Sequence, residues 1–139
     1  MGVVEKIEYT KFEAGSHLAG VAALLRAMGW DNFRYDPDLT LRSLTAPGVT
    51  TIVAVARDAG SVVGFAQVFG DGVVQAHLGL LAVDEEWRRI GVARGLVEEA
   101  FERSGAERMD LTSSDEALDF YRSFRHREQV GFRIYCDKD

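Results

Sequence analysis

The sequence predicts an α/β domain in which helices pack on a mixed β-sheet. Segments of β-branched and apolar residues alternate with segments whose apolar residues recur at helical spacing. Three consecutive strand-like segments, separated by short glycine turns, predict an antiparallel meander. The chain after them has the order strand, glycine loop, helix, strand, which is typical of a parallel crossover unit.

The bulk properties limit the classes of function. A chain of 139 residues without linkers or repeats predicts one domain, residues 1–139. The net charge of -6 argues against nucleic acid or an anionic membrane as partner, and it permits a cationic ligand. We see no signal peptide or membrane-spanning run and expect a cytoplasmic protein. The single cysteine excludes an internal disulfide, and the three dispersed histidines indicate no metal site: Cys136, His17, His77 and His126.

The first third of the chain predicts a strand and two helices. Ser16 is a plausible N-cap of the first helix, and Gly29 is a plausible stop. The loop after it is rich in aspartate and aromatic residues. These elements are a strand at 3–12, a helix at 16–29, a loop at 30–38 and a short helix at 39–44.

The middle of the chain predicts the meander. Its strands are expected at 50–57, 61–69 and 73–83. Asp58-Ala59-Gly60 and Gly70-Asp71-Gly72 are typical turn sequences. Gly79, inside the third strand, is consistent either with a β-bulge or with a glycine tolerated in an ordinary strand.

The last third predicts a helix, a short strand, a second helix and a last strand. An apolar stripe marks the first of these helices, and Gly105 ends it. The remaining elements are expected at 108–112, 114–124 and 129–136. The stripe consists of Val92, Leu96, Val97, Ala100 and Phe101.

The loop between residues 84 and 92 has features that suit an anion. Gly91 and Ala93 leave room for an approaching phosphate, and Arg88 and Arg89 provide positive charge. The free N–H groups of residues 89–94 lie at the positive end of a helix dipole. The simpler alternative is an ordinary strand-to-helix turn with glycine at a tight bend.

The motif R-x-x-G-x-A at Arg88, Gly91 and Ala93, together with the order β-α-α-β-β-β-α-β-α-β, resembles the GCN5-related N-acetyltransferase (GNAT) superfamily. The resemblance covers nearly the whole chain. It implies that the loop binds the pyrophosphate of acetyl-CoA, a cosubstrate. The implied cofactor-binding residues are Leu81, Ala82, Val83, Arg88, Arg89, Gly91, Val92, Ala93, Arg94 and Ser114.

The resemblance also implies where the two parallel strands separate. The edge at 81–83 would pair loosely with 109–112 and give backbone partners to the pantetheine arm. The N–H of Leu81 would then donate to the thioester carbonyl and stabilise the oxyanion.

Two side chains are candidates for acid–base catalysis. His77 stands eleven residues before Arg88, where histone-acetylating members have a catalytic glutamate, and its imidazole suits proton transfer at neutral pH. A structural strand histidine is the alternative. Tyr121 lies in ALDFYRSF, which resembles the stretch whose tyrosine protonates the departing thiolate. For Tyr121, the alternative is a core aromatic residue.

The acceptor site is expected between residues 30–44 and the last strand. Aspartates and aromatic rings there suit an amine, although a solvated loop anchored by its rings is the better interpretation. They are Asp31, Asp36, Asp38, Trp30, Phe33 and Tyr35. Most family members have one more strand after 129–136, so we expect the last strand to be missing and a homodimer to cover the exposed edge.

The resulting interpretation is an N-acetyltransferase that transfers an acetyl group from acetyl-CoA to a primary amine by direct attack. A non-catalytic acyl-CoA sensor and an unrelated phosphate-binding α/β domain are the alternatives. The sequence leaves the acceptor and the acyl length open.

Overall fold

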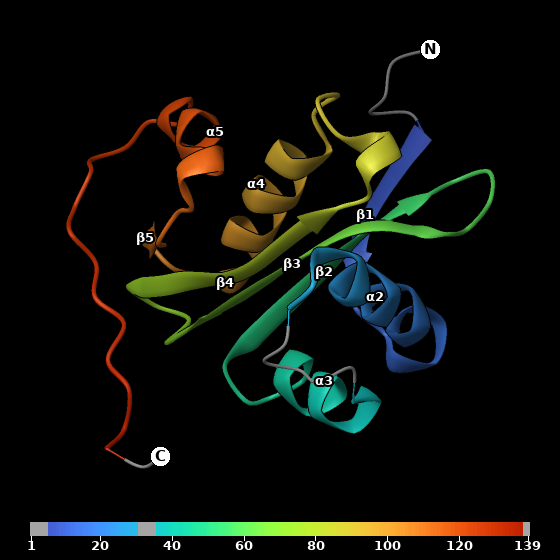
Figure 1. Ribbon diagram of the computed structural model, residues 1–139, viewed down its shortest axis with the longest axis horizontal. Helices are drawn as coiled ribbons and strands as arrows, with labels where there is room; N and C mark the ends of the chain where they lie inside the picture. The colour runs from blue at the N-terminus through green and yellow to red at the C-terminus, as the bar shows by residue number, and fades with distance from the viewer. Residues whose placement is uncertain (1–5, 31–35, 138–139) are drawn as a thin grey trace.

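A mixed five-stranded sheet forms the centre of the computed structural model, which describes residues 6–30 and 36–137 (Figure 1). The strand order is β1-β2-β3-β4-β5, with β1 to β4 antiparallel and β5 parallel to β4. Their bounds are β1 Ile7–Lys11, β2 Val49–Ala56, β3 Val62–Gly70, β4 Gln75–Val83 and β5 Arg108–Asp110. The predicted α/β class and the meander are confirmed.

Helices cover both faces of this sheet (Figure 1). The helices α2 (Ala14–Met28) and α3 (Pro37–Leu44) pack on one face around Phe65 and Leu25, and we call it the α2–α3 face. The helices α4 (Val92–Ser104) and α5 (Leu118–Arg122) lie on the other, the α4–α5 face, where Leu96 is fully buried. The two 3-10 turns are η2 (Glu85–Trp87) and η3 (Asp115–Ala117).

The helix boundaries correct two predictions. The helix α2 begins after Glu13, so Ser16 lies inside its first turn and is not the N-cap. The helix α3 begins at Pro37, two residues early, because the Asp36 side chain accepts hydrogen bonds from the N–H groups of Asp38 and Leu39. Both predicted stops are confirmed, since Gly29 and Gly105 adopt left-handed conformations with φ of 68° and 77°.

The strands β4 and β5 pair over a short stretch and then separate. Gln75–His77 is in register with Arg108–Asp110, and β4 from residue 78 onward has no partner on β5. The expected pairing of 81–83 with 109–112 is therefore wrong, because β5 leaves β4 after Asp110. Val68 faces Leu78 while Gln67 faces Leu80, so Gly79 is the extra residue of a β-bulge, as one of the two interpretations required.

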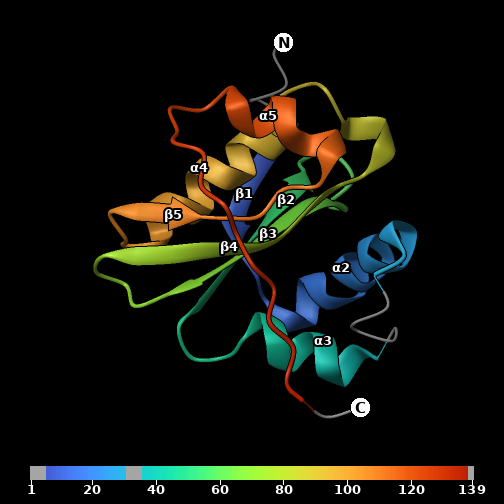
Figure 2. The ribbon, with the colours of Figure 1, turned by 60° about the vertical axis from the view of Figure 1, so that its left-hand side comes forward.

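The C-terminal segment, residues 125–137, contains no helix or strand. Figures 1 and 2 show it leaving α5 as an extended chain. The predicted strand at 129–136 is therefore wrong for a single protomer: its residues are strand formers, but no neighbouring edge pairs with them. The predicted helix at 114–124 forms as η3 and α5, and residues 3–5 of the first predicted strand lie outside the described residues.

The helices within residues 6–30 and 36–137 are short or carry charged residues. None of the helices there has the length and apolar character needed to cross a membrane.

Candidate active site

The loop between η2 and α4 presents several backbone N–H groups in one concave turn. Arg89 and Gly91 both adopt positive φ, 66° and 96°, on either side of Ile90. Alternation of this kind turns successive N–H groups toward one point, which is the geometry of an anion-binding nest. Within the described residues, the N–H groups of 89–94 donate to no protein acceptor, whereas that of Gly95 already bonds to the Gly91 carbonyl. The loop therefore has the free backbone donors that the predicted anion site requires, and anion binding there stays a prediction.

The side chain of Arg88 is directed back toward the sheet rather than into this nest. Its Nε–H donates to the Val83 carbonyl oxygen at 2.9 Å, and its Nη2 lies 3.5 Å from the Met28 sulfur. Arg88 therefore connects the end of β4 to the end of α2 and holds the loop in place. Its charge still adds to the positive field near the nest.

The first turn of α4 is held against β1 by Tyr9. The Tyr9 hydroxyl donates to the Val92 carbonyl at 3.5 Å, and a Cβ added to Gly95 would overlap the tyrosine ring. Burial, and secondarily the nearby Glu98 carboxylate, raise the pKa of Tyr9 above its ordinary value. The neutral ring thus fixes the position of the helix N-terminus.

The outer edge of β4 beyond the bulge has unpaired backbone groups. The N–H of Asp84 donates to Val63 on β3 at 2.7 Å. Alternate residues of a strand point their N–H groups to the same side, so Ala82 also faces β3, while Leu81 and Val83 face the gap beside β5. The Val83 carbonyl confirms this direction, because it accepts from Arg88 rather than from β3. The N–H of Leu81 therefore points into the opened gap.

His77 lies on the α2–α3 face, where β4 and β5 begin to separate. It is in register with Phe69 on one side and with Asp110 on the other, and its ring centroid is 5.1 Å from that of Phe69. The side chain is half-buried. A base at this point would meet an acceptor that arrives from the α2–α3 face.

Tyr121 lies on the opposite face. It belongs to α5 and packs against the core of the α4–α5 face, with the Phe120 ring 4.9 Å away. Burial raises the pKa of its phenol above the ordinary value. Tyr121 therefore holds its proton more firmly than a free phenol does, and both the core role and the acid role agree with this placement.

Other predicted contacts are placed less favourably for a ligand. The Arg94 guanidinium lies 3.9 Å from the centroid of the Phe124 ring and donates to the Ser123 hydroxyl, so it ties α4 to α5. Ser114 is exposed and makes no side-chain cap bond to η3. The Val92 and Ala93 side chains face the core, and only their N–H groups point to the nest.

The predicted acceptor region is described in part. Asp31, Phe33 and Tyr35 lie outside the described residues, and Asp36 is occupied as the cap of α3. Trp30 packs beside the core of the α2–α3 face. An anchoring role for this tryptophan agrees with the interpretation of the region as a solvated loop anchored by its rings.

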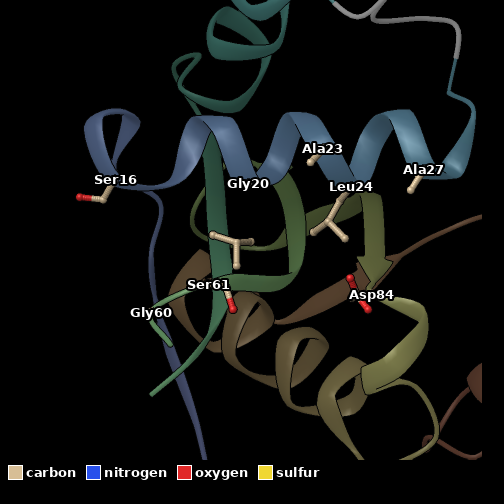
Figure 3. A pocket seen from close by; sticks show the side chains of 9 residues that line it. Ser16, Gly20, Ala23, Leu24, Ala27, Gly60, Ser61 and Asp84 are labelled. Atoms are coloured by element: carbon tan, nitrogen blue, oxygen red, sulfur yellow. The ribbon is translucent and has the colours of Figure 1, made fainter. Parts of the chain in front are cut away.

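A shallow groove runs along α2 and ends beside the loop. Figure 3 shows small residues of α2 on one wall, and the β2–β3 turn and Asp84 on the other. A second hollow shares Leu24, Ala27 and Asp84 with it and continues to Arg88. The residues of the first hollow are Ser16, Gly20, Ala23, Leu24, Ala27, Gly60, Ser61, Val62 and Asp84.

Sequence reasoning missed three residues near the site. Tyr9 supports the helix that carries the nest, and Asp110 shares the face of His77. Gln67 is buried beside the bulge, where its Nε2 donates to the carbonyl and hydroxyl of Ser43 on α3. A lone amide in an apolar strand was the sequence signal that could have found Gln67. No sequence signal indicated Tyr9 or Asp110, because the register of the strands brings these two residues to the site.

The chain is similar to known proteins in sequence and in structure. The sequence model of the family described as acetyltransferase (GNAT) domain matches residues 50–125, more than half of the chain. The chain matches no curated protein.

Several solved acetyltransferases share the fold. One is an aminoglycoside acetyltransferase from an uncultured soil metagenomic sample, solved with sisomicin: it is 22% identical, has a TM-score of 0.78, and covers 98% of this chain and 99% of its own. Aminoglycoside N-acetyltransferase AAC(6')-Iy in complex with CoA is 21% identical, with a TM-score of 0.71 and coverages of 94% and 95%. Glucosamine-6-phosphate N-acetyltransferase from Arabidopsis thaliana is 16% identical, with a TM-score of 0.70 and coverages of 94% and 99%.

Proposed function

Because the chain belongs to the GNAT family of acyl-CoA-dependent acetyltransferases, we propose that it transfers the acetyl group of acetyl-CoA to a primary amine of a small molecule or protein by direct attack. One observation carries the proposal. The free N–H groups of residues 89–94 adjoin the opened edge of β4, where the N–H groups of Leu81 and Val83 face the gap. The two sets of free donors suit a pyrophosphate at the loop and the amide-containing arm attached to it along the edge of β4.

In this proposal the two proton transfers take place on opposite faces of the sheet. An amine arriving on the α2–α3 face attacks the thioester carbonyl carbon, and the N–H of Leu81 donates to the oxygen that becomes negative. The carbon–sulfur bond then breaks, and Tyr121 on the α4–α5 face gives its proton to the sulfur. The products are an amide and the free thiol.

His77 acts through water in this scheme. Leu81 lies four positions further along the strand than His77, which corresponds to about 13 Å of extended chain. That separation is too long for direct proton abstraction by the imidazole. A water chain from the amine to His77 removes the proton that the attacking nitrogen loses.

The acceptor is expected to be cationic. The chain carries a net charge of -6, and Asp110 lies beside His77 on the acceptor face. The relatives solved with sisomicin or named for glucosamine-6-phosphate make aminoglycosides and amino sugars the first acceptors to test, with peptide amines third.

Calorimetry of acetyl-CoA binding, with two variants of Gly91, tests the proposal. Nothing lies within 4 Å of a Cβ added there, so Gly91→Glu and Gly91→Gln share the same cost of the positive φ and differ only in charge. We expect Gly91→Glu to weaken binding by about 100-fold relative to Gly91→Gln, because a carboxylate then opposes the pyrophosphate. Equal affinities in the two variants would contradict the proposed site, and acetylation assays on the acceptor panel would follow a positive result.

A further inference from the structure

The C-terminal segment contains an unpaired strand. Residues 129–136 alternate apolar side chains over an extended chain, which is the pattern of a strand with one buried face. Val130, Phe132 and Ile134 are nevertheless 84%, 86% and 91% exposed. Across the described part of the chain, no strand pairs with residues 129–136. A row of exposed apolar side chains of this kind indicates a surface that is covered by a partner.

An unpaired sheet edge lies beside this segment. The strand β5 is the outermost of the sheet, so one of its sides has no neighbour among the described strands. A Cβ on Gly131 would approach the Thr112 methyl to 2.8 Å, which places the segment next to the end of β5. The segment passes this edge without joining it. An exposed edge pairs readily with another strand.

The segment and the edge have opposite charge. Residues 125–137 carry Arg125, Arg127 and Arg133 against Glu128 and Asp137, and Glu128 is already paired with Arg122. Residues 108–116 at the edge include one arginine, Arg108, against three acids, Asp110, Asp115 and Glu116. The net charge is therefore +1 for residues 125–137, with three arginines and two acids, and -2 for residues 108–116, with one arginine and three acids, and this opposite sign favours their approach.

We propose that a second copy of this chain supplies the missing strand, with residues 129–136 of each copy pairing with the β5 edge of the other. Among the described residues, each copy has an unpaired extended segment and, beside it, the unpaired edge of β5, so a two-fold exchange pairs both at once and closes the assembly. A strand from an unrelated protein would leave the copy's own segment exposed. The reciprocal match within one sequence therefore favours the second copy as the partner.

The exchanged strand completes the active site of its partner. Met109 and Leu111 pack on the α4–α5 core, so the apolar row of the incoming strand belongs on that face. Strand alternation then places Arg133 and Tyr135 of the second copy on the α2–α3 face, beside His77 and Asp110. The acceptor side of each site is thus bounded by the other copy, and a separated protomer lacks this wall.

The molar mass in solution tests the exchange without any reference to acetyl-CoA. Light scattering over a concentration series is expected to give twice 15.4 kDa. The double variant Phe132→Glu/Ile134→Glu should raise the dimer dissociation constant by about 100-fold or more, because it buries carboxylates in the new interface. Val73→Glu is the matched control: Val73 is an apolar residue, 65% exposed, in the β3–β4 turn, and its change should leave the mass unaltered.

Hydrogen exchange of the amides at 129–136 identifies the strand that forms the interface. Slow exchange in the dimer, and exchange at the rate of free chain in the double variant, are the expected results. A monomer, an open-ended oligomer, or a dimer that survives the double variant with the segment unprotected would each overturn the exchange. Acetyl-CoA calorimetry on the same samples keeps the two proposals separable, since the nest lies on α4 and does not involve the segment.

Discussion

The β4–α4 unit, residues 75–104, and the C-terminal segment, residues 125–137, lie at opposite extremes of packing in this molecule. Leu96 and Ala100 of α4 are fully buried between β2, β3 and β4, whereas Ile134 is 91% exposed. In the β4–α4 unit, β4 pairs with neighbouring strands and the Tyr9 hydroxyl donates to the first turn of α4. The C-terminal segment lies near Thr112, which is close to Gly131. The difference teaches that an apolar pattern forms regular structure only where the fold provides a partner for it.

A substitution at Gly95 gives the largest expected effect, because α4 and β1 leave no room there. A Cβ on Gly95 would overlap the Tyr9 ring, so Gly95→Leu should lower the free energy of unfolding by about 3 kcal/mol. The measurement is chemical denaturation followed by circular dichroism. Gly15→Leu is the matched control, since a Cβ on Gly15 of α2 meets nothing within 4 Å and leucine is the better helix former. Equal losses in both variants would contradict the tight contact.

Removal of the Tyr121 hydroxyl is expected to act on turnover rather than on binding. Tyr121→Phe keeps the ring in its place and removes the proton donor, so kcat should fall by about 100-fold. The KM for acetyl-CoA and the thermal midpoint should stay as they are. An unchanged kcat would assign Tyr121 to the core alone, like its neighbours Phe120 and Phe124.

Alkaline pH should weaken the fold through two half-buried phenols, those of Tyr9 and Tyr121. The pKa values of Tyr9 and Tyr121 are raised in the folded chain, so both groups hold protons that the unfolded chain has begun to release. This stabilising contribution is complete below the ordinary phenol pKa of about 10, and it is lost as the pH rises through the higher folded values. The measurement is the free energy of unfolding, taken from denaturation curves between about pH 9 and about pH 11, a window around that reference value. It should fall more steeply with pH in the unmodified chain than in the double variant Tyr9→Phe/Tyr121→Phe.

A substitution in the C-terminal segment should have the smallest effect on protomer stability. Ile134→Ala should change the free energy of unfolding by less than about 0.5 kcal/mol in dilute solution, because the side chain is exposed. Leu96→Ala, at a fully buried position, should cost about 3 kcal/mol. Comparable losses would show that the segment packs on its own protomer, contrary to the exchange between copies.

Local signals in the sequence located the helix ends and the loop well. Gly29 and Gly105 end helices because their left-handed conformation is open to glycine at little cost, and Gly79 marks the bulge that turns β4. The R-x-x-G-x-A motif located the nest for the same reason, since Gly91 tolerates its positive φ. The cap of α2 was misassigned, because Ser16 and Glu13 stand within one turn and the chain enters the helix at the earlier residue.

Contacts between distant segments were not predictable from local pattern. The Arg88 side chain was expected at the phosphate, and the structure directs it to Val83 and Met28 instead. The pairing of β4 with β5 lies four or more residues away from the expected register. Neither the direction of a long side chain nor the register of two strands is encoded by neighbours in the chain.

The sequence by itself determined the order of helices and strands as far as α5, the glycine turns and the position of the glycine loop before α4, because helix periodicity, capping and turn conformation depend on residues within one or two turns of each other. The tertiary structure alone decided that His77 and Tyr121 lie on opposite faces of the sheet, that the Leu81 N–H points into the gap, and that residues 129–136 are left unpaired. The physical reason is that a helix makes its hydrogen bonds within itself, whereas a strand needs a partner brought from elsewhere. For the last strand of this chain, we propose that the partner is a second copy.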